Sequence, residues 1–76
     1  MITILAFGKI AEIAGKQKWE ETDVENVAML EQRLRESYPQ IEKIPVVIAV
    51  NKIKAKSADP VPSGAVVAVL PPFSGG

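Results

Sequence analysis

Apolar residues follow one another with few interruptions in three short segments, at residues 1–7, 46–50 and 65–70. Runs of this length and composition are typical of strands in the middle of a sheet. We therefore predict three buried strands, the first of them buried on both faces. Because the first and last segments are the most apolar, we expect them to lie side by side and parallel in the centre of the sheet.

Two further segments have the polarity of strands near the border of a sheet. Residues 18–24 are mostly polar, and their main hydrophobic side chain, Trp19, is expected to serve packing. A tight turn is predicted at Asn51, which tolerates left-handed φ and is not expected to be a catalyst. Residues 52–56 then alternate between lysine and an apolar side chain, the period of a half-exposed strand. We expect the three lysines to form a solvated face of this strand, with recognition of a partner as the alternative. They are Lys52, Lys54 and Lys56.

One long amphipathic helix is predicted in the middle of the chain. Asn26 is a good N-cap for it, Asp23 is a competing one, and Pro39 prevents the helix from continuing. A shorter helical pattern of one or two turns lies between Gly8 and Gly15. The apolar face of the long helix consists of residues at helical spacing: Val27, Leu30, Leu34 and Tyr38.

The order of the main elements is therefore β, β, α, β, β, β. This order predicts an α+β fold in which one mixed sheet of about five strands carries one main helix across one face. That is a β-grasp, or ubiquitin-like, arrangement. A chain of 76 residues leaves no room for a second domain, so we assign residues 1–70 to the β-grasp domain and residues 71–76 to an extended C-terminal tail.

Composition argues against several kinds of function. Nine basic and nine acidic residues give a formal net charge of zero, so no positive excess favours nucleic acid. The sequence has no cysteine and no histidine, which removes thiolate nucleophiles, the usual zinc ligands and imidazole catalysis. We expect no bound metal or cofactor. No apolar run approaches the roughly 18 residues of a membrane span, and no signal peptide is recognised, so we expect a cytoplasmic protein without membrane binding.

The most informative segment is the C-terminal one, where two prolines precede Phe73, Ser74 and a pair of glycines. Proline fixes φ and stiffens the chain, whereas glycine, which has no Cβ, can enter a narrow channel. Six extended residues reach roughly 20 Å. A reactive tail is the hypothesis, and a frayed terminus is the alternative. Phe73 lies beyond the last predicted strand, so we expect it to enter a partner's pocket, with folding back onto the domain as the alternative.

The chain resembles the small subunit of molybdopterin synthase, a ubiquitin-like sulfur carrier. The most specific match is the ending Leu70-Pro71-Pro72-Phe73-Ser74-Gly75-Gly76, because related thiazole sulfur carriers share Gly-Gly but generally lack Pro-Pro. The other matching stretches span nearly the whole chain: residues 4–7, 12–15, Asn26-Val27 with Leu30 and Leu34, Tyr38-Pro39, residues 49–51, Gly64 and residues 67–70.

The resemblance implies a mechanism in which this chain carries sulfur and does no catalysis itself. A partner resembling ubiquitin-activating enzymes would use ATP to adenylate the carboxylate of Gly76, and sulfur would then replace the adenylate to leave a thiocarboxylate. The tail would next enter the large catalytic subunit of the synthase. There the sulfur would pass to a cyclic pyranopterin precursor during molybdenum cofactor biosynthesis.

The resemblance also implies the site residues. Gly76 would carry the activated group and Gly75 would complete the narrow tail. Phe7 and Leu70 would contribute to an apolar patch that both partners grip, with ordinary core packing as the alternative. The rest of the segment would also contact partners: Pro71, Pro72, Phe73 and Ser74.

Three positions depart from the family pattern. Ala11 replaces a frequent arginine, Ala65-Val66 replaces a frequent Asp-Glu pair, and Phe73-Ser74 brings more bulk to the tail than the usual valine and small residue. The first two remove charges expected near the tail. Other functions stay open, namely a sulfur carrier for thiazole synthesis or tRNA thiolation, a ubiquitin-like protein modifier, and a binding module with an inert tail. The sequence does not decide the stoichiometry of the complex or whether the final metal is molybdenum or tungsten.

Overall fold

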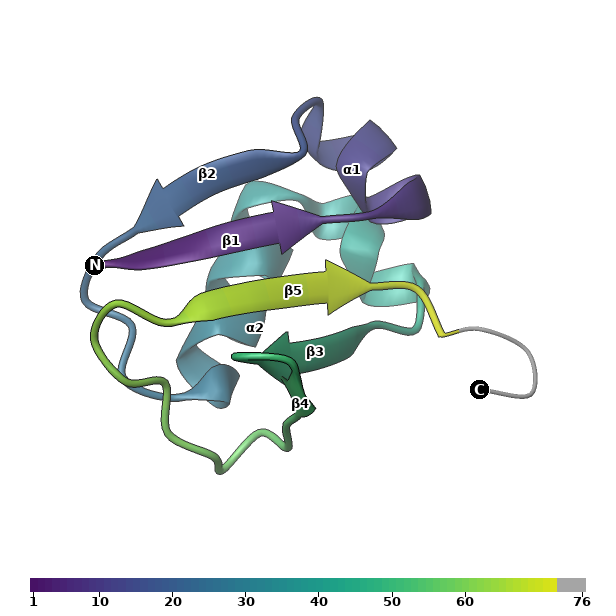
Figure 1. Ribbon diagram of the computed structural model, residues 1–76. Coiled ribbons are helices and arrows are strands. Elements are labelled where there is room, and N and C mark those ends of the chain that lie inside the picture. Colours follow the sequence, from purple (N-terminus) through teal and green to yellow (C-terminus); the bar gives the residue numbers. More distant parts are fainter. Residues whose placement is uncertain (73–76) are drawn as a thin grey trace.

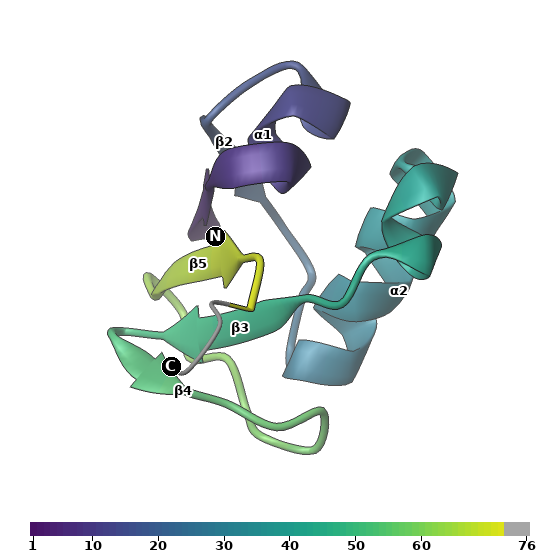
Figure 2. The same ribbon diagram turned by 90° about the vertical axis from the view of Figure 1, so that its right-hand side faces the viewer.

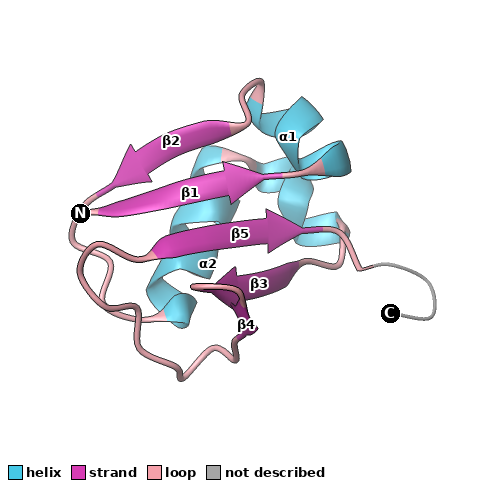
Figure 3. Ribbon diagram, in the orientation of Figure 1, coloured by secondary structure: helices cyan, strands magenta, loops and turns pink. Residues whose placement is uncertain are grey.

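Five strands form one mixed sheet in the order β2-β1-β5-β3-β4, and one long helix crosses it (Figures 1 and 3). The computed structural model describes residues 1–72. The strands are β1 (Ile2–Ala6), β2 (Lys18–Glu21), β3 (Val47–Val50), β4 (Ile53–Lys54) and β5 (Val66–Leu70). The helices are α1 (Gly8–Ala14), α2 (Val27–Ser37) and the 3-10 helix η1 (Pro39–Lys43). The predicted β-grasp fold, with one main helix across one face of the sheet, is confirmed.

The first and last strands are parallel neighbours in the middle of the sheet, as predicted. Thr3 of β1 is in register with Val66 of β5, and Ala6 is in register with Val69. On the other side of β5, β3 runs antiparallel and places Val47 opposite Leu70. The end of β5 therefore lies between the end of β1 and the start of β3.

Helix α2 begins after the predicted N-cap and ends at Ser37, so Tyr38, which was expected on its apolar face, is instead its C-cap. The side chain of Asn26 accepts a hydrogen bond from the Met29 N–H at 2.9 Å, which satisfies one of the free donors of the first turn. The competing cap, Asp23, lies instead in the preceding loop with φ of 60°. Pro39 follows the helix and opens η1, a short element that the sequence analysis did not predict. The buried face of α2 consists of Val27, Leu30 and Leu34.

The prediction that the first strand is buried on both faces is wrong. Along β1, Ile2, Ile4 and Ala6 are buried, whereas Thr3 and Leu5 between them are half-buried. The view along the sheet shows the reason, because α2 lies on one side only (Figure 2). The segment is apolar on both faces, yet the chain has one long helix to cover them. We call the uncovered side the open face.

The two polar strands are shorter than predicted. Strand β2 occupies the expected edge but ends at Glu21, before the turn at Asp23. The second polar segment forms a strand only over Ile53–Lys54, and it is not half-exposed, since Ile53 has 72% of its surface exposed. Alternation alone could not show this, because it does not reveal that β4 is the outermost strand of the sheet, where Ile53 lies outside the core.

Candidate functional site

The exit of the chain from the domain is fixed by a close contact between two distant segments. Strand β5 ends at Leu70, and the half-buried Pro71 that follows lies against Gly8 at the start of α1. A Cβ added to Gly8 would lie 3.1 Å from Cγ of Pro71, and Gly8 also has a left-handed φ of +57°. Glycine suits this position for two reasons, its backbone conformation and the space that Pro71 occupies.

Phe7 and Leu70 end adjacent strands, as predicted. The Phe7 N–H donates to the carbonyl oxygen of Val69 at 3.1 Å, which continues the β1–β5 ladder one residue beyond Ala6, where β1 ends. Phe7 has 43% of its surface exposed, and Leu70 is half-buried. Ordinary core packing therefore does not describe Phe7. A large aromatic side chain is available beside the point where the chain leaves the domain.

The remainder of the predicted tail lies outside the described residues. Phe73, Ser74, Gly75 and Gly76 belong to this group, so their proposed roles stay predictions. Pro72 is exposed and is the last described residue. The chain leaves the domain between α1 and the start of β3 (Figure 1).

A largely apolar hollow of about 410 Å³ lies on the open face and extends from Phe7 to the turn at Asn51. Asn51 closes one end of it with two hydrogen bonds to Val66. Its backbone N–H donates to the Val66 carbonyl oxygen at 2.8 Å, and its side-chain oxygen accepts from the Val66 N–H at 2.9 Å. The residues that line the hollow are Leu5, Phe7, Asn51, Lys52, Val66 and Ala68.

The predicted turn role of Asn51 is confirmed, because its φ is 50° and that of Lys52 is 74°. Sequence reasoning missed the second role of Asn51, the side-chain contact with β5. The predicted exposure of the three lysines is also confirmed, since Lys52, Lys54 and Lys56 are all exposed. Trp19 serves packing as expected, with its ring edge against Tyr38 at 6.2 Å between centroids and its indole N–H donating to Glu21.

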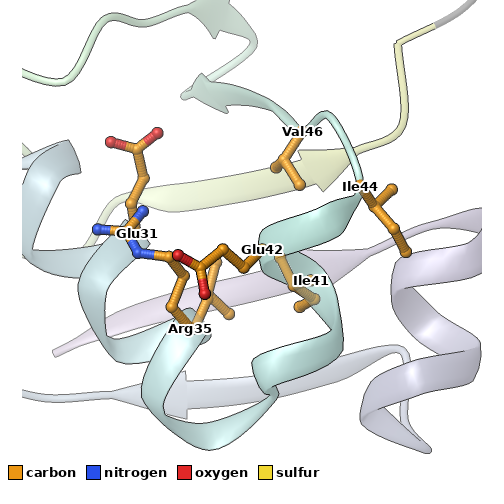
Figure 4. Close-up of a pocket in the computed structure, with 7 residues that line it drawn as sticks. Glu31, Arg35, Ile41, Glu42, Ile44 and Val46 are labelled. Atoms are coloured by element: carbon orange, nitrogen blue, oxygen red, sulfur yellow. The ribbon is translucent and has the colours of Figure 1, made fainter.

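A second hollow of about 420 Å³ lies between α2, η1 and the segment before β3 (Figure 4). Its floor is apolar, with buried Leu34 and Ile41, but its rim carries charges of both signs from Glu31, Arg35 and Glu42. Glu31 is already engaged, because it accepts a hydrogen bond from the Ser57 hydroxyl at 2.7 Å. This mixed rim gives no indication of the ligand that the hollow would take.

The site is suited to presentation and docking. Among residues 1–72, no group of three or more carboxylate, cysteine or histidine side chains is gathered as a metal would require. No helix in the same part of the chain is long and apolar enough to cross a membrane. What this end of the domain offers is an exposed aromatic ring, a largely apolar hollow and a fixed starting point for the C-terminal segment.

Comparison with known proteins agrees with this picture. Residues 4–76 match the model of the ThiS family. No match was found among curated proteins. A putative molybdopterin converting factor, subunit 1, from Pyrococcus furiosus superposes with a TM-score of 0.81 at 20% identity, over 95% of this chain and 97% of that one.

Two other similar structures are an archaeal modifier protein and a second molybdopterin-converting factor. The H. volcanii small archaeal modifier protein 1 has a TM-score of 0.76 at 18% identity, with 95% of this chain and 97% of that chain covered. Subunits 1 and 2 of the molybdopterin-converting factor from Helicobacter pylori form a complex, and the match to it has a TM-score of 0.71 at 23% identity, covering 99% of this chain and 97% of that one. At such low identities these likenesses establish the fold alone.

Proposed function

The chain belongs to the ThiS family, and we propose that it is a sulfur carrier whose reactive group is the carboxylate of Gly76. The observation that carries the proposal is the exit of the chain. Pro71 is held against Gly8 beside the exposed ring of Phe7, so the last residues start from a fixed point next to an apolar surface. A carrier needs this combination, because its partner must hold the domain while the tail reaches the partner's active site.

The chemistry assigned to Gly76 needs no catalytic group from this chain. A carboxylate oxygen attacks the α-phosphorus of ATP in the partner enzyme, and pyrophosphate leaves. Hydrosulfide supplied by a sulfur donor then attacks the acyl carbon of the adenylate, AMP leaves, and the product is the thiocarboxylate. Precise placement of the reacting atoms supplies much of the rate, and a side-chain-free Gly75 and Gly76 permit that placement.

We propose further that the carrier is the small, sulfur-donating subunit of molybdopterin synthase. Its partners would then be the large catalytic subunit and an adenylyltransferase that resembles ubiquitin-activating enzymes. The sequence Pro71-Pro72 before the tail supports this assignment over a thiazole or tRNA-thiolation carrier. The likeness to two structures described as molybdopterin converting factor subunits supports it as well.

The proposed docking surface is the end of the sheet from which the tail leaves. Phe7 and Leu70 would form its apolar centre, because they end the two central strands and neither is fully buried. Pro71, Pro72, Phe73 and Ser74 would continue the contact into the partner's channel. Apolar side chains at the centre of an interface usually contribute most of its binding free energy.

A ubiquitin-like protein modifier is the second candidate function. The observation that favours it is the likeness to the archaeal modifier protein, whose TM-score lies between those of the two molybdopterin converting factor structures. Both functions begin with adenylation of a C-terminal glycine. They differ afterwards, because a modifier ends in an isopeptide bond to a lysine of another protein.

The two candidates are separated by co-expressing the chain with the activating enzyme from the same organism. A sulfur carrier gains the mass difference between one sulfur and one oxygen at its C-terminus, as read from the intact mass. A modifier instead appears in adducts with other proteins, whose tryptic digests contain lysines bearing residues 57–76 of this chain, because Lys56 is its last basic residue. If the chain gains neither sulfur nor adducts, the binding module with an inert tail replaces both proposals.

A further inference from the structure

The free edge of β2 has backbone hydrogen-bonding groups that point away from the sheet. Strand β2 is the outermost strand, and it pairs with β1 alone. The Ala6 N–H donates to the Gln17 carbonyl oxygen at 2.9 Å, and hydrogen-bonded pairs alternate with non-hydrogen-bonded pairs along an antiparallel ladder. Counting along the register from this pair, Lys18 and Glu20 are the residues whose N–H and C=O groups are directed away from β1.

The side chains at these two positions have opposite charges. Lys18 and Glu20 are both exposed, and both project from the open face because they are in register with open-face residues of β1. The one ion pair within residues 1–72 joins Arg33 to Glu21 and includes neither of them. Each outward position of β2 therefore combines a backbone donor and acceptor with a charged side chain, and the two charges differ in sign.

An edge of this kind is complementary to a second copy of itself. If an antiparallel copy is placed with the two-fold axis at Trp19, Lys18 lies opposite Glu20 of the second copy, and Glu20 lies opposite Lys18 of the second copy. Each of these pairs would exchange two backbone hydrogen bonds, because the outward groups face each other. Sliding the strands by two residues sets Lys18 opposite Lys18 or Glu20 opposite Glu20, and like charges directly opposite each other are destabilising. Charge therefore selects one register.

The residue at the centre of this register is the half-buried Trp19, which lies on the covered face. Its ring packs against Tyr38, and Nζ of Lys16 lies 5.0 Å from the ring centroid. In the pairing, Trp19 faces Trp19 of the second copy as a non-hydrogen-bonded pair, the kind in which side chains approach more closely. Aromatic pairs across neighbouring strands stabilise a sheet, so the centre of the contact would add to the two charge pairs.

We propose that two copies of this chain pair antiparallel through β2 and join their sheets into one, with the two-fold axis at Trp19. The proposal goes beyond the carrier function and does not depend on it. Because β5 is parallel to β1 and β1 is antiparallel to β2, the β5 strands of the two copies run in opposite directions. Five strand spacings of about 4.8 Å separate them, or roughly 24 Å. The two tails would leave opposite ends of the joined sheet, where each can enter its own partner.

The contact is short, so the dimer should be weak. Strand β2 has four residues, and pairing along it buries less surface than a stable interface requires. Its charges are exposed, so added salt should weaken the pairing. The alternative is a solvated edge whose charged side chains discourage pairing with any strand.

The test uses the whole chain without any partner. Sedimentation measures self-association over a wide range of protein concentrations, at low and moderate salt. Trp19 is the only tryptophan of the chain, so its fluorescence reports on the same edge. Lys18→Glu and Glu20→Lys each place like charges opposite one another in both pairs. Glu42→Lys changes the charge at an exposed position in η1, beside the segment before β3, and is the matched control. Thermal unfolding verifies that each variant is folded.

We expect the parent to associate at high concentration, with the emission of Trp19 moving to shorter wavelength as water leaves the indole. Each reversal should weaken dimerisation by about tenfold or more, while Glu42→Lys leaves it unchanged. Mixing the Lys18→Glu and Glu20→Lys variants should restore pairing, because every opposed pair again has charges of opposite sign. The double variant that exchanges both charges should pair as the parent does.

A parent that stays monomeric at every concentration, with constant Trp19 emission, would overturn the proposal. Association that survives both reversals would overturn it as well, since the interface would then lie away from β2. The same conclusion would follow if the parent dimerised but the mixture of the two reversed variants stayed monomeric.

Discussion

Gly8 and Pro71, which lie far apart in the sequence, are neighbours at one end of the sheet, and a Cβ on the glycine would be crowded by the proline ring. The added atom would lie 3.1 Å from Cγ of Pro71 at a residue whose φ is +57°. The connection from β1 to α1, at Gly8, and the start of the tail, at Pro71, therefore restrict each other's position. A change at residue 8 is expected to act on stability and on the direction of the tail together.

Gly8→Ala should destabilise the fold by about 1–3 kcal/mol, because alanine is strained at this φ and its methyl group displaces Pro71. Gly15→Ala is the matched control, since Gly15 also has a positive φ of +75° but nothing lies within 4 Å of its added Cβ. Urea unfolding of both variants separates the two causes. Equal losses would mean that the contact with Pro71 contributes nothing. Slower sulfur loading of Gly8→Ala alone would connect the contact to the direction of the tail.

Asn51→Ala should cost about 1–2 kcal/mol of unfolding free energy, because the Val66 N–H loses its acceptor and alanine is disfavoured at positive φ. Asn51→Asp keeps an acceptor oxygen and tolerates the same φ of 50°, so it should remain within about 0.5 kcal/mol of the parent. Denaturant titration of both variants is the measurement. An aspartate variant as unstable as the alanine variant would contradict the assigned hydrogen bond.

The sequence predicted the fold well because the strongest signals agreed with one another. Asn26 and Pro39 delimit α2 by local chemistry, and the apolar runs of β1 and β5 lead both strands to the centre of the sheet. Periodicity could not show that one face of β1 would stay open. A strand with apolar residues on both sides has the same sequence whether or not a second layer covers it.

The sequence indicated which residues belong to the candidate site, but it did not indicate how they are arranged in space. The exposure of Phe7 depends on the absence of a covering layer on the open face, and the contact of Gly8 with Pro71 joins residues at opposite ends of the sequence. Such relationships follow from the tertiary arrangement, which a local pattern does not encode.

Phe7→Ala should separate binding from folding. Because the ring is 43% exposed, its loss should cost about 1 kcal/mol of stability or less, yet it should weaken association with a tail-receiving partner by about 1–3 kcal/mol. Ile4→Ala, three residues earlier and on the covered face, removes a fully buried side chain and should cost about 2–5 kcal/mol of stability. Thermal unfolding and calorimetric titration of both variants test the contrast. Parent-like affinity in Phe7→Ala would remove Phe7 from the docking surface.

The last prediction concerns the reacting group itself. Deletion of Gly76 moves the terminal carboxylate back by one residue, roughly 3.5 Å, whereas catalysis requires the reacting atoms within about 3–3.5 Å of each other. Appending an alanine after Gly76 instead places a side chain where we expect a channel that admits none. Neither change touches the sheet, so both variants should unfold at the temperature of the parent.

With ATP, a sulfur donor and the activating enzyme, the parent should become a thiocarboxylate while both variants keep their original intact mass. Ser63→Ala is the control, because it changes an exposed loop residue and leaves the length and the end of the tail unaltered, and this variant should acquire sulfur. Variants that gain sulfur as readily as the parent would show that the position of the Gly76 carboxylate does not matter. In that case the tail would not be the carrier of the reactive group, and the exposed end of the sheet would have to be explained by binding alone.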